Sequence, residues 1–202
     1  MKRAKRNNEE TKHALLHAAL NVFSEVGYEN ARLEDIALAA ELSRGAIYHN
    51  FGGKSEIFKE LIAQYGITAD QVISDIYRSE ETATQNIERF VSSSLDFLVS
   101  NENYRKIAIL TSFNLKATAE LKDVCEVLEH DTQQYLIYLS SLVQKGVDNG
   151  EFASQLSVEI TAMSILSQVN GLSNLWLAYP DIVPLREKAT MFSEVIIKGL
   201  KK

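Results

Sequence analysis

The sequence predicts an all-α protein in two parts, a small N-terminal three-helix domain and a larger C-terminal helical domain. First, only two prolines and nine glycines interrupt the 202 residues, so long helices can form. Second, apolar residues recur three and four positions apart along most of the chain, which is typical of amphipathic helices. Third, residues 1–60 hold nine basic and nine acidic residues, so the net charge of −6 falls entirely on the remainder.

The first helix is expected from Glu9 to Val26. One apolar stripe follows its length, made of Leu15, Leu16, Ala19, Val22, Phe23 and Val26. Gly27 is expected to end this helix in the left-handed conformation, after which Tyr28 can fold back on Phe23.

A disordered basic arm is expected ahead of this helix, over residues 1–8. The first six residues hold no acid and four bases, Lys2, Arg3, Lys5 and Arg6. Such an arm can follow a DNA backbone or enter the minor groove, and an ordinary solvated tail would have the same composition.

Residues 32–51 have the pattern of a helix-turn-helix. A short helix over 33–40 places Ile36 and Ala37 inward, and a second helix over 44–50 places Ile47 inward. Glu41 lies in the turn, where a left-handed conformation is expected, and Ser43 is the expected N-cap of the second helix. With the first helix, this motif completes a DNA-binding domain over residues 9–53.

The outer surface of the second helix carries side chains suited to DNA. Its length of about 10 Å is comparable to the width of the major groove, about 12 Å. Arg44 can fork onto guanine or phosphate, and Gly45 lets the backbone approach the duplex. The other candidate contacts are Tyr48 and Lys54 to phosphate, His49 to base or phosphate, and Asn50 to phosphate or to the helix end. Ser43, at the start of the helix, is a further candidate DNA contact. The alternative is two small helices in an ordinary all-α protein, but such a polar outer surface favours DNA.

This N-terminal region resembles a known family. The stretch 18–28, then Asp35-Ile36-Ala37, then 45–54 resembles the signature of the TetR family of bacterial repressors, and the resemblance runs from Thr11 to Leu61. It implies that Tyr48 and Lys54 contact phosphates and that Arg44, His49 and Asn50 lie at or near bases. Residues 44–48, 170–172 and 176–177 are similar to those of the AcrR-like multidrug-efflux branch.

Two positions depart from the family pattern. Glu41 stands where the family usually has Gly, and a non-Gly residue in a left-handed turn costs about 1–2 kcal/mol. Arg32 stands where the family favours Thr or Ser at the start of the first motif helix, and losing that cap costs about 1 kcal/mol. Arg32 can gain a phosphate contact in exchange.

The C-terminal domain is expected over residues 54–202. It begins with a long helix over 54–79, followed by helices over 82–100, 102–113, 120–149, 158–177 and 185–200. The last two helices are apolar on more than one face, so each must be buried on two sides. We therefore expect a homodimer through 158–177 and 185–200, which would present two recognition helices to double-stranded DNA with a palindromic operator.

The resemblance also implies a pocket for a hydrophobic small-molecule inducer in this domain. Apolar walls with a few polar groups are typical of such pockets. The candidate lining residues are Phe90, Phe97, Phe113, Tyr135, Asn170 and Trp176, each of which is alternatively a plain core residue. Because the domain is acidic, cationic lipophilic compounds belong among the candidates.

Other function classes find little support. No apolar run reaches the roughly 18 residues of a membrane span, so no membrane partner is expected. The single cysteine, Cys125, cannot form an intramolecular disulfide and fits a reducing cytoplasm, and a redox role for it rests on weak evidence. His13 and His17 lack a third metal ligand nearby, and no nucleophile elbow or nucleotide fingerprint occurs, so no metal, cofactor or enzyme activity is predicted.

The function predicted from these observations is a ligand-responsive DNA-binding repressor, controlling an efflux or transport gene and released from its operator by a lipophilic molecule. The alternative is a ligand-independent DNA-binding structural factor of the nucleoid. A third class, an all-helical enzyme, has no supporting constellation of residues.

Overall fold

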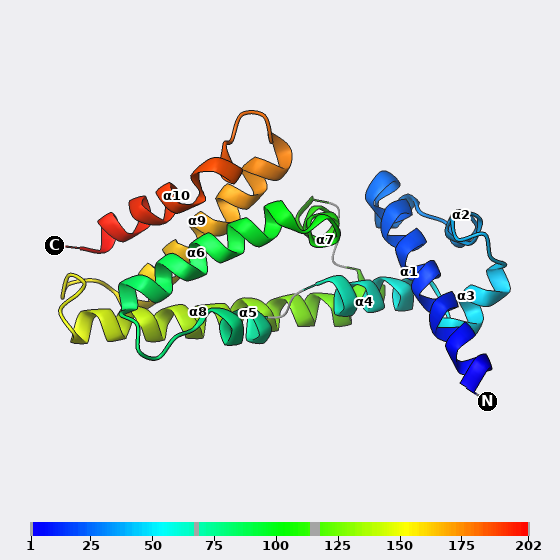
Figure 1. Ribbon diagram of the computed structural model, residues 1–202, viewed down its shortest axis with the longest axis horizontal. Coiled ribbons are helices and arrows are strands. Elements are labelled where there is room, and N and C mark those ends of the chain that lie inside the picture. The colour runs from blue at the N-terminus through cyan, green and yellow to red at the C-terminus, as the bar shows by residue number, and fades with distance from the viewer. Residues whose placement is uncertain (1, 67–68, 114–117, 202) are drawn as a thin grey trace. The chain divides into compact units, whose positions relative to one another are not determined.

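The computed structural model describes residues 2–66, 69–113 and 118–201, and every regular element in these ranges is helical (Figure 1). The elements are α1 (Lys2–Asn30), α2 (Leu33–Ala39), α3 (Arg44–Asn50), α4 (Lys54–Tyr65), α5 (Ala69–Ile76), α6 (Ala83–Ser100), α7 (Glu102–Phe113), the short 3-10 helix η1 (Ala119–Leu121), α8 (Lys122–Asp148), α9 (Val158–Ala178) and α10 (Leu185–Leu200). The predicted all-α class is confirmed. None of the described helices combines the length and apolar character that a membrane crossing requires.

The chain divides into two compact units. The first comprises Met1–Ile67 and Asn103–Glu126, and the second comprises Thr68–Glu102 and Val127–Lys202. The first unit is thus larger than the predicted 9–53 domain, because α4 and the segment 103–126 pack with the N-terminal helices.

The predicted disordered arm over residues 1–8 needs correction, since helix α1 already begins at Lys2. Residues 2–8 include Ala, Lys and Arg, which are good helix formers, and contain neither Gly nor Pro. The helix can therefore extend backwards from its apolar stripe without a break. Near its other end Gly27 interrupts the helix with φ 78° and ψ 161°, so the positive φ predicted for it is confirmed, but one further helical turn follows to Asn30.

The predicted single helix over residues 54–79 is wrong, because α4 ends at Tyr65 and α5 begins at Ala69. Gly66 ends α4 with an extended backbone, at φ −68° and ψ 155°. A Cβ at this position would lie 2.3 Å from the carbonyl oxygen of Ile62, so no other residue fits this conformation. The segment predicted as one long helix is therefore two helices, with α4 in the first unit and α5 in the second.

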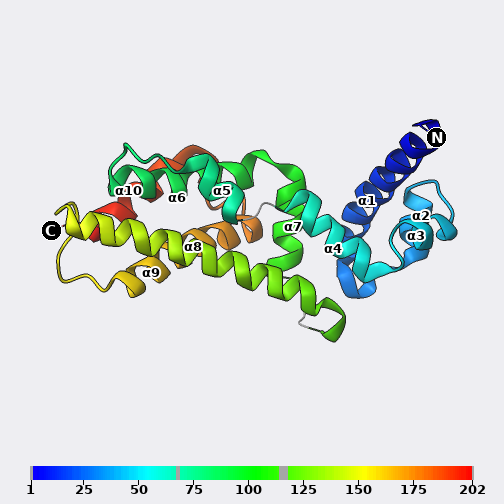
Figure 2. The same ribbon diagram turned by 90° about the horizontal axis from the view of Figure 1, so that it is seen from below.

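An aromatic cluster holds the first unit together. The rings of Phe23, Tyr28 and Phe58 lie with centroids 5.0–5.6 Å apart, which joins the end of α1 to α4. Tyr28 thus folds back on Phe23 as predicted. Burial together with the neighbouring Glu120 raises the pKa of the Tyr28 phenol above its usual range. Helices α2 and α3 lie beside α1 and contact each other (Figure 2).

In the second unit α6 is the central helix, packed against α5, α9 and α10 (Figure 1). Its first turn is fixed by a capping box between Thr82 and Gln85. Its apolar stripe is buried and includes Ile87, Phe90, Val91 and Leu95. The predicted bounds of α7 and α10 are confirmed, and Gly150 ends the turn after α8 with φ 75°.

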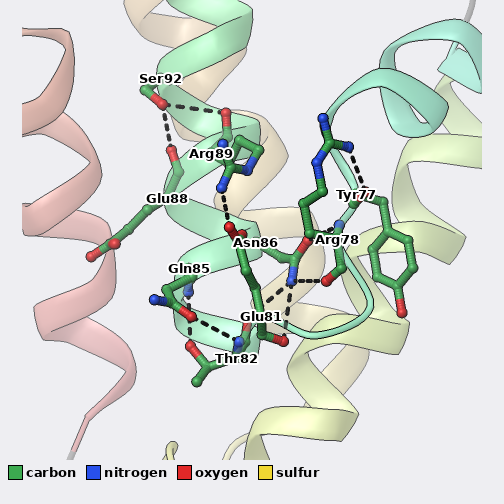
Figure 3. Close-up of polar contacts among 9 residues, drawn as sticks. All are labelled: Tyr77, Arg78, Glu81, Thr82, Gln85, Asn86, Glu88, Arg89 and Ser92. Atoms are coloured by element: carbon green, nitrogen blue, oxygen red, sulfur yellow. Dashed lines mark hydrogen bonds and ion pairs between the residues drawn. The ribbon is translucent and has the colours of Figure 1, made fainter.

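The buried side-chain amide of Asn86 stabilises the α5–α6 loop through hydrogen bonds (Figure 3). Asn86 is fully buried. Its Nδ2 donates to the carbonyls of Arg78 and Thr82 at 2.9 and 3.0 Å, and its Oδ1 accepts from the Arg78 N–H at 2.9 Å. The carboxylate of Glu151 adds a second anchor, because it accepts from the N–H groups of Ala83 and Thr84 at 3.0 and 2.9 Å.

Candidate nucleic-acid interface and ligand-binding region

The turn between α2 and α3 is a Schellman motif. The N–H of Glu41 donates to the carbonyl of Leu38 at 3.0 Å, and the N–H of Leu42 donates to the carbonyl of Ala37 at 2.9 Å. Glu41 occupies the left-handed position of this motif with φ 55°, and it is the one described non-glycine residue with positive φ. The prediction of a left-handed Glu41 is confirmed.

Helix α3 spans the predicted residues, and Ser43 caps it. The Ser43 Oγ accepts from the N–H of Ala46 at 3.3 Å. Ile47 is fully buried, so it fixes which side of the helix faces outward. Arg44, Gly45, Tyr48 and His49 are all exposed on the other side. A Cβ at Gly45 would meet only the Ser43 Oγ, at 3.6 Å, so the helix surface is open there.

The Arg44 guanidinium is held by two neighbours. Its Nη1 forms an ion pair with the Glu34 carboxylate in the first turn of α2, and its Nη2 donates to the Tyr48 hydroxyl at 2.9 Å. The guanidinium also lies 5.4 Å from the centroid of the Tyr48 ring. These contacts raise the pKa of Arg44, mainly through the Tyr48 hydrogen bond and then through the charge of Glu34.

Two further predicted DNA contacts lie at helix ends, Arg32 before α2 and Asn50 in the last turn of α3. Arg32 is exposed at the N-cap of α2, and its side chain makes no cap hydrogen bond. Asn50 donates from Nδ2 to the carbonyl of Ala46 at 2.7 Å, so of the two roles considered for it the structure has the one at the helix end. The DNA contacts of both residues stay predictions.

Lys54 has a structural role that its sequence position did not indicate. Its Nζ donates to the carbonyls of Tyr28, Ala31 and Glu29 at 2.9, 3.3 and 3.4 Å, and it lies 4.4 Å from the centroid of the Tyr28 ring. A lysine at these positions satisfies carbonyls at the end of a helix. In this structure the ammonium therefore ties α4 to the end of α1, and its phosphate contact stays a prediction.

Further contacts, which no pattern in the sequence indicates, join the segment 103–126 to the N-terminal helices. Lys106 Nζ donates to the Asn21 Oδ1 at 2.9 Å, and Lys59 pairs with Asp123 at 2.6 Å. The Lys59 ammonium lowers the pKa of the Asp123 carboxyl, and the Asp123 carboxylate in turn raises the pKa of Lys59. Segments that continue into the second unit thus contact the helices that support α3.

Two of the predicted ligand-lining residues meet in the second unit. The Phe90 ring lies 5.6 Å from that of Tyr135, and Tyr138 extends the cluster, 6.0 Å from Phe90 and 6.1 Å from Tyr77. The Tyr138 hydroxyl is buried and has no hydrogen-bond partner among the described residues. Burial, with Tyr77 as a lesser cause, raises the pKa of Tyr138 to about 12.

Near this cluster, an ion pair joins Glu81 to Arg89 on α6 (Figure 3). The hydrogen bond from Arg89 lowers the pKa of Glu81, whereas Glu81 raises that of Arg89. The Arg89 Nε and the Glu81 Oε2 are buried, and within the part of the chain that the structure describes neither atom has a hydrogen-bond partner. Unpaired polar atoms beside an aromatic cluster are the features of the second unit best suited to bind a small molecule.

The other predicted lining residues differ in how deeply they are buried. Trp176 is buried and Phe97 is half-buried, whereas Asn170 is exposed on α9. The side chain of Phe113 lies outside the described residues. The ligand contacts of all these residues stay predictions.

The last two helices expose a series of apolar side chains. Ile160, Met163 and Leu175 of α9 and Met191 and Val195 of α10 are each 41–65% exposed. Apolar residues repeated on neighbouring helices of one unit are typical of a protein–protein interface. This exposure supports the prediction that these helices have a second face to bury.

Together, α1–α3, the Schellman turn and the outward Arg, Tyr and His of α3 define a helix-turn-helix protein. Residues 15–61 match the family model described as bacterial regulatory proteins, tetR family. The transcriptional repressor BepR of Brucella suis biovar 1 (strain 1330) is 28% identical over 178 residues, which cover 88% of this chain and 85% of BepR. Residues 15–61 thus form a tetR-family DNA-binding domain, and TetR-family regulators such as BepR are homologues of this chain.

Solved structures agree on the fold. NalD, the secondary repressor of the MexAB-OprM multidrug efflux pump in Pseudomonas aeruginosa, matches with a TM-score of 0.85 and 24% identity, covering 98% of both chains. SmeT in complex with triclosan matches with a TM-score of 0.77 and 20% identity, covering 96% of this chain and 92% of that one. The AcrR-like resemblance predicted from the sequence is consistent with these relatives.

Proposed function

We propose that the protein is a ligand-responsive transcriptional repressor that binds a palindromic operator as a homodimer. The observation that carries this proposal is the outer surface of α3, where Arg44, Tyr48 and His49 are exposed on a capped helix within a tetR-family domain. Such a helix fits the major groove, where arginine reads guanine and tyrosine can donate to phosphate.

Homodimerisation is proposed through α9 and α10. A second copy related by a two-fold axis would cover the exposed apolar side chains. Each square ångström of apolar surface buried in this way contributes about 25 cal/mol to the free energy of association. Two copies would also place two α3 helices on half-sites roughly 34 Å apart, or a multiple of this distance, which matches one turn of DNA.

The ligand is proposed to be a lipophilic small molecule bound near Phe90, Tyr135 and Tyr138. The aromatic rings offer apolar contact, and the buried Tyr138 hydroxyl and Arg89 Nε offer hydrogen-bond donors. A ligand of this kind would shift the population towards a state that no longer binds the operator. The efflux-pump control stated for NalD and the triclosan bound by SmeT support a similar role here, at an efflux or transport gene.

A selection experiment tests the proposal. The purified protein is used to enrich duplexes from a random library, and a gel shift then measures release of the enriched duplex by a lipophilic quaternary ammonium compound, by triclosan and by a fatty acid. We expect one palindromic motif and its release by at least one compound. Binding spread over all duplexes and indifferent to every compound would support the DNA-binding structural factor instead.

A further inference from the structure

The DNA-binding surface carries an acidic residue beside its main base-reading candidate. Glu34 lies in the first turn of α2, and its carboxylate pairs with the Nη1 of Arg44 across the turn. The side chains of Glu34 and Arg44 are 56% and 53% exposed, so this pair lies at the surface and not in the core. A carboxylate at a surface that approaches phosphates is repelled by them, so its presence there needs a physical reason.

The geometry leaves the guanidinium able to read a base while Glu34 holds it. Each Nη of arginine carries two N–H groups. One N–H group of Nη1 donates to the Glu34 carboxylate and one N–H group of Nη2 donates to the Tyr48 hydroxyl, so one N–H group remains available on each nitrogen. Two N–H groups are what bidentate pairing with guanine O6 and N7 requires.

We propose that Glu34 is a specificity-determining residue of this surface, acting together with the Tyr48 hydroxyl to hold Arg44 for a base edge. This inference rests on the proposed DNA-binding function. On the specific site, Arg44 keeps Glu34 and also pairs with guanine, so neither charge is left alone. On other duplexes, a phosphate that approaches the paired Arg44 also approaches the Glu34 carboxylate, and the repulsion between these two anions disfavours non-specific binding.

Tyr48 fits the same arrangement. Its hydroxyl oxygen accepts the hydrogen bond from Arg44, so its own O–H stays available to donate to a phosphate. The ring also supports the guanidinium, 5.4 Å from its centroid. Tyr48 therefore positions Arg44 while it can still contact the backbone of the duplex.

The test compares Glu34→Gln with Asp35→Asn, which removes one negative charge from the same turn of α2 at an exposed residue. Dissociation constants are measured by fluorescence anisotropy for the duplex enriched by the wild-type protein and for a random-sequence duplex, over a range of salt concentrations. Circular dichroism confirms that each variant is folded.

For Glu34→Gln we expect the ratio of random to enriched dissociation constants to fall roughly threefold to tenfold, a part of the 5- to 150-fold that a good bidentate contact supplies. On the random duplex, log K against log salt should steepen by about 0.9, because the released Arg44 gains one phosphate contact. Tyr48→Phe should also lower the ratio of random to enriched dissociation constants, since it removes the hydrogen bond between the Tyr48 hydroxyl and Arg44.

The outcomes separate the two proposals. An unchanged ratio and slope for Glu34→Gln, or equal changes for Asp35→Asn, would overturn the role of Glu34 while leaving the repressor proposal intact. A wild-type protein that enriches no duplex would overturn the repressor proposal and the role of Glu34 with it.

Discussion

Replacing Glu41 by glycine should stabilise the protein. Glu41 has φ 55° at the left-handed position of the Schellman turn, and it is exposed. A side chain in this conformation costs about 1–2 kcal/mol, whereas glycine loses about 0.5–1 kcal/mol more than other residues through the entropy of the unfolded chain. The net gain should therefore be roughly 0.5–1 kcal/mol.

The assay is thermal unfolding followed by circular dichroism, with urea unfolding as a second measure. For a chain of this length each kcal/mol raises the melting temperature by about 2–4 °C, so we expect an increase of about 1–4 °C. The turn hydrogen bonds of Glu41 and Leu42 involve backbone atoms alone and remain possible in the variant.

Two further variants show whether backbone conformation causes the gain. Glu41→Gln removes the charge and keeps the conformational cost, so its melting temperature should stay near that of the wild type. Gly150→Ala introduces a side chain at φ 75°, so it should destabilise. A lower melting temperature for Glu41→Gly, or an equal gain for Glu41→Gln, would refute the reasoning.

Three more predictions concern the second unit. Gly146→Ala should lower the free energy of unfolding by about 1–3 kcal/mol, because a Cβ there would lie 2.2 Å from the buried ring of Phe152. The control is Gly199→Ala, which should be neutral or slightly stabilising because a Cβ there would meet no described atom within 4 Å. Equal free energies of unfolding for the two variants in urea would contradict this prediction. Glu151→Gln should destabilise by roughly 1–2 kcal/mol through the lost charge-assisted cap of α6. Burial opposes ionisation of Glu151, but the N–H groups of Thr84 and Ala83 prevail and lower its pKa. Glu151 should therefore stabilise the protein at pH values above the pKa that its carboxyl has in the unfolded chain, and this stabilisation should be lost as pH falls through the pKa of the folded state. If Glu151→Gln unfolded in acid at the same pH as the wild type, this contribution to stability would be refuted. Tyr138→Phe should leave the melting temperature unchanged or raise it, since the buried hydroxyl has no partner in residues 2–66, 69–113 and 118–201; a loss of stability would contradict this.

The features predicted correctly from the sequence depend on local interactions. The bounds of α3, its Ser43 cap and the left-handed Glu41 all follow from residues within one turn of each other. The same holds for the positive φ of Gly27 at the end of the first apolar stripe.

The features that the sequence did not predict depend on tertiary packing. A single glycine in a helical pattern costs only about 1 kcal/mol, so Gly66 did not indicate the break between α4 and α5. The position of Lys54 under the carbonyls of residues 28–31 depends on how α1 and α4 cross. Asn170 lies in a helix with several apolar faces, and the sequence pattern does not indicate which face is exposed. Glu34 could have been noticed as an acid in the first turn of α2, but its pairing with Arg44 requires the turn geometry.

The most direct test of the central claim, that α3 reads duplex DNA, is a comparison of wild type and Arg44→Ala on the enriched duplex and on its single-base variants. The wild type should prefer the enriched duplex over random sequence, and Arg44→Ala should lose about 1–3 kcal/mol of discrimination at one base pair of each half-site. A wild-type protein with no preference for any duplex would contradict the claim, and a uniform loss on all sequences would make Arg44 a phosphate contact.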